Sequence, residues 1–178
     1  MGTYSLNVPV PPVVRRLANR LEPALTPFRS IRDRPTLVVK RFDGRRSRGE
    51  IEGVAREVLA GVAPFDARVT AVNAFTDPPT GAAPVVYLAI ESPGLRRLHE
   101  RLVDRVGAVS GIEGAAYAPH VTLARGVPDT AADDVDRTET ALRRLRHRGI
   151  EQVSWTIDTL GVWNREYAEI VTRFPLTG

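Results

Sequence analysis

Two patterns of apolar and polar residues occur in successive segments of the chain. Apolar and polar positions alternate in some segments, which is typical of strands with one buried face. In others, apolar residues recur every three to four positions, which is typical of amphipathic helices. The alternating segments predict strands at residues 4–10, 36–41, 67–75, 85–90, 120–125, 153–162 and 168–174. The helical segments begin at Pro12 and at Pro93, span residues 50–60, and run from Asp129 or Thr130 to about 146.

The order of these predicted elements repeats, which indicates a duplicated unit. Residues 12–21 and 93–102 share the proline, three arginines and two leucines at matching positions. Each of the two segments follows a predicted strand and precedes a Thr-Leu pair, Thr36-Leu37 in one case and Thr122-Leu123 in the other. This repeat aligns Thr36 with Thr122.

The repeat and a turn signal at residues 77–81 suggest how the chain is organised. We predict a single α+β domain over residues 1–178 with two lobes, the first about 1–76 and the second about 85–162, completed by a strand at about 167–175. In each lobe, helices would cover the outer face of a mostly antiparallel sheet.

Composition excludes several classes of protein. The 178 residues are 43% hydrophobic and 26% charged, as in an ordinary globular protein, and cysteine is absent. Disulfides, cysteine-ligated zinc, iron–sulfur clusters and thiol catalysis are therefore excluded. No apolar run reaches the roughly 18 residues of a membrane span, and the first residues lack the pattern of a signal peptide. We expect a cytoplasmic protein.

Charge and histidine content narrow the candidate chemistry. The net charge is +4, Lys40 is the only lysine, and all other basic residues except the three histidines are arginines. Arginine suits bidentate recognition of phosphate, so a nucleic acid or nucleotide partner is compatible with this balance, as is a general arginine bias. The basic run at residues 143–148 could touch an RNA backbone or could simply be a solvated helix end. Among the histidines, we predict that His99 is a partly exposed structural residue and that His147 belongs to that basic run.

The segment 117–125 carries the most informative chemistry. In a strand, His120 and Thr122 share one face while Val121 and Leu123 point to the other. An imidazole can transfer a proton near neutral pH, and a hydroxyl two positions further on can donate to the same phosphate. The alternative is a strand histidine that is merely half exposed.

Three segments together resemble the 2H phosphoesterase superfamily, in its branch of 2′-5′ RNA ligase-like proteins and RNA 2′,3′-cyclic phosphodiesterases. They are Tyr4-Ser-Leu-Asn-Val-Pro-Val, Pro119-His-Val-Thr-Leu-Ala-Arg125 and the stretch from Leu160 to Leu176. The resemblance covers nearly the whole chain. It implies a bilobal, pseudo-duplicated fold with two sheets flanking a central groove, where two His-x-Thr or His-x-Ser motifs face each other.

The resemblance also implies the site residues. His120 would be the second catalytic histidine, and Thr36 and Thr122 the two hydroxyls. Arg34 stands in the place of the first histidine, because it precedes Thr36 as His120 precedes Thr122. Arg34, Thr36, Thr122 and Arg125 would hold the phosphate. A guanidinium cannot exchange protons at pH 7, so we expect slow catalysis or binding alone. Arg34 could instead be a surface residue paired with Asp33.

The function implied is that of a metal-independent phosphodiesterase acting on 2′,3′-cyclic phosphate ends of RNA or nucleotides. Its partner would be an RNA or nucleotide with a cyclic phosphate or a 2′-5′ linkage. We expect no cofactor, no metal and no membrane partner, with a monomer favoured. Tyr117 and Trp163 could stack on a base or could be packing residues. Two alternatives remain open: an inactive module that binds a nucleotide or RNA phosphate, and a scaffold domain that binds another protein.

Overall fold

The computed structural model describes residues 3–129 and 131–178. It contains a mixed α+β fold with four α-helices and nine strands among these residues, which confirms the predicted class. The helices are α1 (Pro12–Leu25), α2 (Arg48–Leu59), α3 (Pro93–Val106) and α4 (Ala132–His147). The strands are β1 (Tyr4–Val8), β2 (Ser30–Ile31), β3 (Leu37–Arg41), β4 (Phe65–Phe75), β5 (Val85–Glu91), β6 (His120–Arg125), β7 (Val153–Ile157), β8 (Thr159–Asn164) and β9 (Glu169–Pro175).

The strands form one antiparallel sheet in the order β7-β4-β5-β6-β3-β1-β8-β9, with β2 beside β6. The two halves of the chain exchange strands in this sheet. Strand β4 belongs to the stretch 1–76 but pairs with β5 and β7, whereas β8 belongs to the second stretch but pairs with β1.

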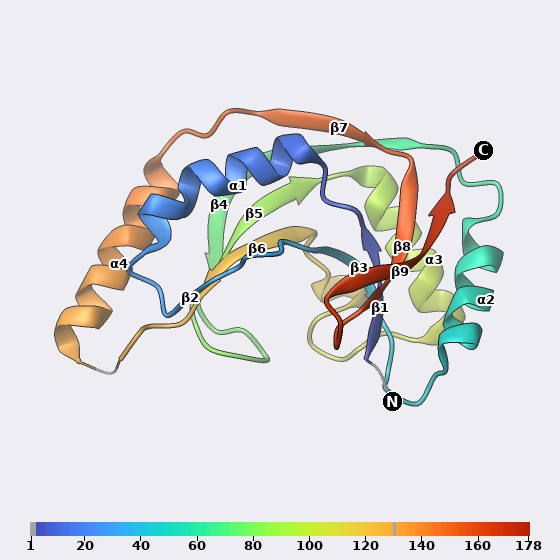
Figure 1. The fold of residues 1–178 in the computed structure, drawn as a ribbon, viewed down its shortest axis with the longest axis horizontal. Coiled ribbons are helices and arrows are strands. Elements are labelled where there is room, and N and C mark those ends of the chain that lie inside the picture. The colour runs from blue at the N-terminus through green and yellow to red at the C-terminus, as the bar shows by residue number, and fades with distance from the viewer. Residues whose placement is uncertain (1–2, 130) are drawn as a thin grey trace.

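The two predicted sheets are joined at their centre, where β3 meets β6 (Figure 1). The pairing between these strands consists of Leu37 opposite Val121. Both side chains are buried in the hydrophobic core, at 0% and 1% exposure. A narrow contact between two wider half-sheets therefore lies in the middle of the molecule, beside His120.

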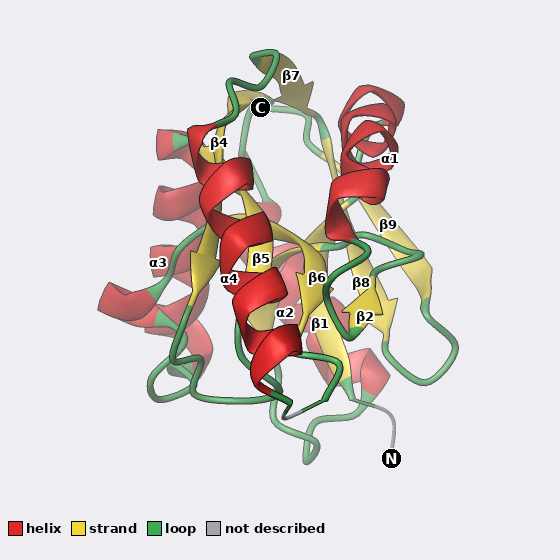
Figure 2. Ribbon diagram, turned by 90° about the vertical axis from the view of Figure 1, so that its left-hand side faces the viewer, coloured by secondary structure: helices red, strands yellow, loops and turns green. Residues whose placement is uncertain are grey.

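The helices form where the sequence supplies a start signal and an apolar stripe. Helix α1 begins at Pro12 and buries Val14, Leu17, Leu21 and Leu25 at helical spacing. In α3, the Ser92 hydroxyl accepts a hydrogen bond from the Leu95 amide. Helices α1 and α4 contact one another, as do α2 and α3, and the pairs lie at opposite ends of the molecule in Figure 1. Figure 2 shows α3 on one side of the molecule and α1 on the other, with β5 and β6 between them.

Two predicted boundaries differ from the structure. The single strand expected at 153–162 is divided at Asp158 into β7, which pairs with β4, and β8, which pairs with β1. Helix α4 has Ala131 at its N-cap and no side-chain cap, so Asp129 does not cap it. Thr130, the other predicted cap, lies outside the described residues.

Candidate active site

His120 is the first residue of β6 and is held in one tautomer. Its Nδ1 lies 2.7 Å from the backbone carbonyl oxygen of Ala118, to which it donates as N–H. Nε2 is then the nitrogen that carries the lone pair. Burial lowers the pKa of His120, the hydrogen bond to Ala118 opposes this, and the positive charges of Arg41 and Arg125 lower it further. The imidazole is therefore neutral at pH 7 and can accept a proton.

The strands on either side of the centre carry matching irregularities. Between β1 and β3, Leu6 pairs with Lys40 and Asn7 with Val38, so Val39 is an extra residue in β3. Between β5 and β6, Val86 pairs with Ala124 and Tyr87 with Thr122, so Leu123 is the extra residue in β6. Each bulge lies two positions after the central pair of Leu37 and Val121.

These bulges define which residues of the two strands correspond. Leu37 and Val121 each lie two positions before a bulge, so they occupy equivalent positions in the two strands. Thr36 is then equivalent to His120, and Val38 to Thr122. This register differs by two positions from the predicted correspondence of Thr36 with Thr122 and of Arg34 with His120. The first motif is Thr36-Leu37-Val38, which has neither an imidazole nor a hydroxyl two positions later.

Arg34 is engaged elsewhere. Its side chain is exposed and its Nη1 donates to the carbonyl oxygen of Ala168, at 3.0 Å, in the turn between β8 and β9. It forms no ion pair with Asp33 among the described residues. Thr36 is half-buried and immediately precedes β3.

A second matching pair is positively charged. Arg41 pairs with Ser5 as Arg125 pairs with Val85, so the two arginines occupy corresponding positions at the ends of β3 and β6. Burial lowers the pKa of both. For Arg41, Glu113 and Tyr117 oppose this lowering of the pKa and Arg165 adds to it. For Arg125, the neighbouring charges of Arg32, Arg41 and Arg165 all lower the pKa further. In the described parts of the chain, none of these four arginines forms an ion pair. The region around His120 is thus suited to an anion.

Two aromatic rings lie beside His120. Phe75 and Tyr87 are stacked with their centroids 4.3 Å apart, and the His120 ring lies 5.2 Å from Phe75 and 5.3 Å from Tyr87. Sequence analysis did not identify either ring as part of a site, because only the pairing of β4, β5 and β6 brings them to the histidine.

The two predicted stacking residues have different surroundings. Tyr117 is 5% exposed, stacks on His99 with a centroid distance of 3.8 Å, and donates its hydroxyl to the Val38 carbonyl oxygen. Its ring is a core residue and is not offered to a base. Trp163 is half-buried in β8 and pairs with Ser5, on whose other side Arg41 lies. It therefore shares a face with Arg41.

Hydrogen bonds from buried polar side chains fix the position of β3. His99 is 1% exposed rather than partly exposed, but its structural interpretation holds. Its Nδ1 donates to the Val39 carbonyl oxygen and its Nε2 accepts from the Gly114 amide. Glu113 accepts from Lys40 Nζ at 2.6 Å and from the amide of Arg41. The segment before β6 is thereby attached to β3.

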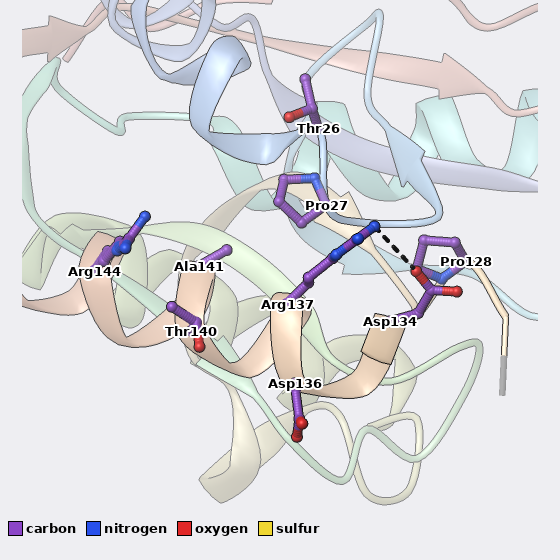
Figure 3. A pocket seen from close by; sticks show the side chains of 9 residues that line it. All are labelled: Thr26, Pro27, Pro128, Asp134, Asp136, Arg137, Thr140, Ala141 and Arg144. Carbon is purple, nitrogen blue, oxygen red and sulfur yellow. Dashed lines mark ion pairs between the residues drawn. The ribbon is translucent and has the colours of Figure 1, made fainter. Parts of the chain in front are cut away.

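Elsewhere, a surface hollow lies between the end of α1 and α4 (Figure 3). Its lining contains none of the predicted site residues, although Arg137 and Asp134 form an ion pair there, with Nη1 and Oδ1 4.0 Å apart. Within residues 3–129 and 131–178, no three His, Asp or Glu side chains are gathered as a metal site would require. No helix of that part of the chain is long and apolar enough to cross a membrane.

Comparison with protein families identifies the chain. Residues 36–169 match the model of the 2′-5′ RNA ligase superfamily. The chain belongs to this superfamily. Membership supports a phosphodiesterase-type function. No curated protein matched the chain.

Solved structures similar to this superfamily member cover nearly its whole length. TT0787 of Thermus thermophilus is 18% identical, with a TM-score of 0.69 over 99% of this chain and 98% of that one. E. coli LigT complexed with NADP+ is 16% identical, with a TM-score of 0.65 over 99% and 98%. Kluyveromyces marxianus Usb1 is 9% identical, with a TM-score of 0.52 over 99% and 97%. At these identities the likeness shows the shared fold.

Proposed function

We propose that the protein is a metal-independent phosphodiesterase that opens 2′,3′-cyclic phosphates at the ends of RNA or of nucleotides, with His120 as its proton acceptor. The observation that carries this proposal is the fixed tautomer of His120, whose unprotonated Nε2 lies in a region of arginines that have no ion-pair partner among the described residues. E. coli LigT has been solved in complexes with 3′-AMP and with phosphate, which supports a nucleotide phosphate as the ligand class.

The chemical step assigns one role to each group. Nε2 of His120 takes a proton from water as the water oxygen bonds to phosphorus, and the bond between phosphorus and one ribose oxygen breaks. That ribose oxygen takes its proton from solvent, because the residue matching His120 is Thr36. Arg41 and Arg125 stabilise the negative charge that develops on the phosphate, and the hydroxyls of Thr36 and Thr122 donate to it. Base stacking would involve Phe75, the half-buried ring beside His120.

An inactive binding module is the second candidate. It is favoured by the correspondence of Thr36 with His120 and of Val38 with Thr122, which removes one proton-transfer group and one hydroxyl from the site. General acid or base catalysis typically contributes about 10²- to 10⁴-fold to a rate. A site with one histidine should therefore hydrolyse its substrate slowly or not at all.

Hydrolysis of 2′,3′-cyclic AMP across a pH series separates the two candidates. An enzyme that uses neutral His120 should show a rate that rises with pH through a pKa below 6.5 and then stays level, since no second imidazole has to be charged. His120→Ala should abolish the hydrolysis. His147→Ala is the matched control, since His147 is exposed at the end of α4, and it should leave the rate unchanged.

Three results would contradict this proposal, each at a different point. Absence of turnover together with saturable binding of 3′-AMP would identify the binding module. Full activity of His120→Ala would remove His120 from the mechanism. A bell-shaped pH profile would show that a second titrating group takes part.

A further inference from the structure

Asn7 is a buried polar residue that the proposed mechanism leaves unexplained. It lies in β1 and is 2% exposed. Its Oδ1 accepts a hydrogen bond from the Ser5 hydroxyl at 2.7 Å, whereas its Nδ2 has no hydrogen-bond partner among the described residues. A buried N–H donor without an acceptor destabilises the folded state, so such groups are uncommon.

The strand register places Asn7 on the same face of the sheet as His120. Its neighbours in β1, Leu6 and Val8, are core residues, so the Asn7 side chain points to the opposite face. In the adjacent strand, Val38 lies directly opposite Asn7, and by continuation of the Leu37–Val121 pairing His120 lies opposite Val38. His120, Val38 and Asn7 thus form a row across β6, β3 and β1.

The groups around the Asn7 amide offer few acceptors. Val38 lies on one side, and Gly161 of β8 lies on the other. The Ile170 side chain occupies the space in front of Gly161, because a Cβ placed on that glycine would lie 2.6 Å from Ile170 Cγ2. The Ser5 hydroxyl holds Oδ1 and so fixes which end of the amide is free.

The position of this free donor matters because of what is missing beside it. Val38 matches Thr122, so the hydroxyl that would complete the first half of the site is replaced by a methyl group. Side chains directly opposite each other on neighbouring strands have Cβ atoms about 4.5–5.5 Å apart. An amide extending from residue 7 can therefore reach the space that a hydroxyl on residue 38 would serve.

We propose that Asn7 Nδ2 donates a hydrogen bond to a phosphate oxygen of the nucleotide ligand, and so takes over the role of the hydroxyl that Val38 lacks. Ser5 is a positioning residue that orients the amide. This inference rests on the proposed function, since it requires a phosphate beside His120. It explains why a buried donor without a partner occurs in β1: the ligand supplies the acceptor.

Calorimetric titration of the protein with 3′-AMP and with inorganic phosphate tests the assignment, alongside thermal melting. Asn7→Leu should weaken binding of both probes by about 10-fold or more, the usual worth of a hydrogen bond to a charged group. Its melting temperature should change little, because the removal of the unpaired donor is offset by the loss of the acceptor of the Ser5 hydroxyl. Asn7→Asp keeps the shape and replaces the donor with a negative charge, so it should bind both probes more weakly still.

A rescue variant separates a ligand contact from a packing effect. Val38→Thr in the Asn7→Leu background restores a donor to the same part of the site and should recover most of the lost affinity. Asn19→Leu, at an exposed position of α1, is the matched control and should change neither affinity nor melting.

The possible failures are distinguishable. A natural protein that binds neither probe would overturn the proposed function together with this inference. Binding by the natural protein that Asn7→Leu leaves unchanged would overturn the role of Asn7 alone. So would an affinity loss that comes with a matching loss of melting temperature and no recovery on adding Val38→Thr.

Discussion

A fixed tautomer and a depressed pKa define what His120 can do at the scale of the single residue. The Ala118 carbonyl fixes the proton on Nδ1, and burial together with two arginines keeps the ring neutral. Thr36 is the residue of the first motif that is equivalent to His120. Its hydroxyl can donate a hydrogen bond but does not titrate near pH 7. The site therefore has a base and lacks a matching acid.

Restoring the first motif should convert this site into a paired one. Thr36→His with Val38→Thr rebuilds His-x-Thr at the positions that match His120 and Thr122, and should raise the rate of 2′,3′-cyclic AMP hydrolysis by about 10-fold or more. The pH profile should become bell-shaped, since one imidazole must be neutral and the other charged. The rate is measured for the double variant and for Arg34→His.

Arg34→His is the control that discriminates between the two alignments of the repeat. Arg34 donates to the turn between β8 and β9, so a histidine there should leave the rate and the pH profile as they are. A rate gain from Arg34→His, and none from the double variant, would contradict the correspondence read from the bulges.

At the scale of the element, β3 depends on the segment that precedes β6. The Glu113 carboxylate is fully buried and accepts from Lys40 Nζ and from the backbone amides of Arg41 and Val109. The Lys40 side chain is 3% exposed, so both charges rely on each other. This network holds the end of β3, and with it the backbone that carries Arg41.

Glu113→Ala should lower the free energy of unfolding by about 3–5 kcal/mol, because it leaves the Lys40 ammonium buried without its partner. Urea denaturation measures the change. The double variant Lys40→Met with Glu113→Gln should recover part of the loss, since it removes both charges and keeps an acceptor oxygen for one of the two amides. A loss below about 1 kcal/mol for Glu113→Ala would show that the ion pair contributes little.

The elements themselves were largely predictable, and their relative positions were not. Alternation located β6 at both ends and β3 to within one residue of its start. The repeat of Thr-Leu aligned Thr36 with Thr122, however, because the sequence does not show that Leu37 pairs with Val121 at the centre of the sheet. Asn7 did leave a signal, since asparagine is unfavourable within a buried strand. The roles of Phe75 and Tyr87 depend on strand pairing, which the pattern of one strand does not determine.

At the scale of the whole molecule, two buried histidines make the fold sensitive to acid. Burial lowers the pKa of His99 and of His120, so both bind protons more readily in the unfolded chain. Stability therefore rises with pH where the unfolded state holds more protons. The stability that depends on neutral His99 and His120 is fully present above about pH 6.5, the ordinary histidine pKa. It is lost as the pH falls towards the lowered pKa values of the two histidines in the folded protein.

Urea denaturation at pH 7.5 and at pH 5.5 should show this loss in the natural protein. His99→Gln should reduce the difference between the two pH values, because the residue that accepts from Gly114 can then no longer be charged. Exposed His147 provides the control, and His147→Gln should leave the difference unchanged. An equal pH dependence in His99→Gln and the natural protein would exclude His99 as its source.

The position of β1 between β3 and β8 has a consequence for how the protein is made. Synthesis proceeds from the N-terminus at about 5–20 residues per second, so β8 leaves the ribosome about 8–30 s after β1. Throughout that interval β1 can pair with β3 on one edge only, and its other edge awaits Gly161 to Asn164. The half of the sheet that holds Asn7 and Arg41 is thus completed only after β8 has been synthesised, whereas β4, β5 and β6 are available for pairing earlier.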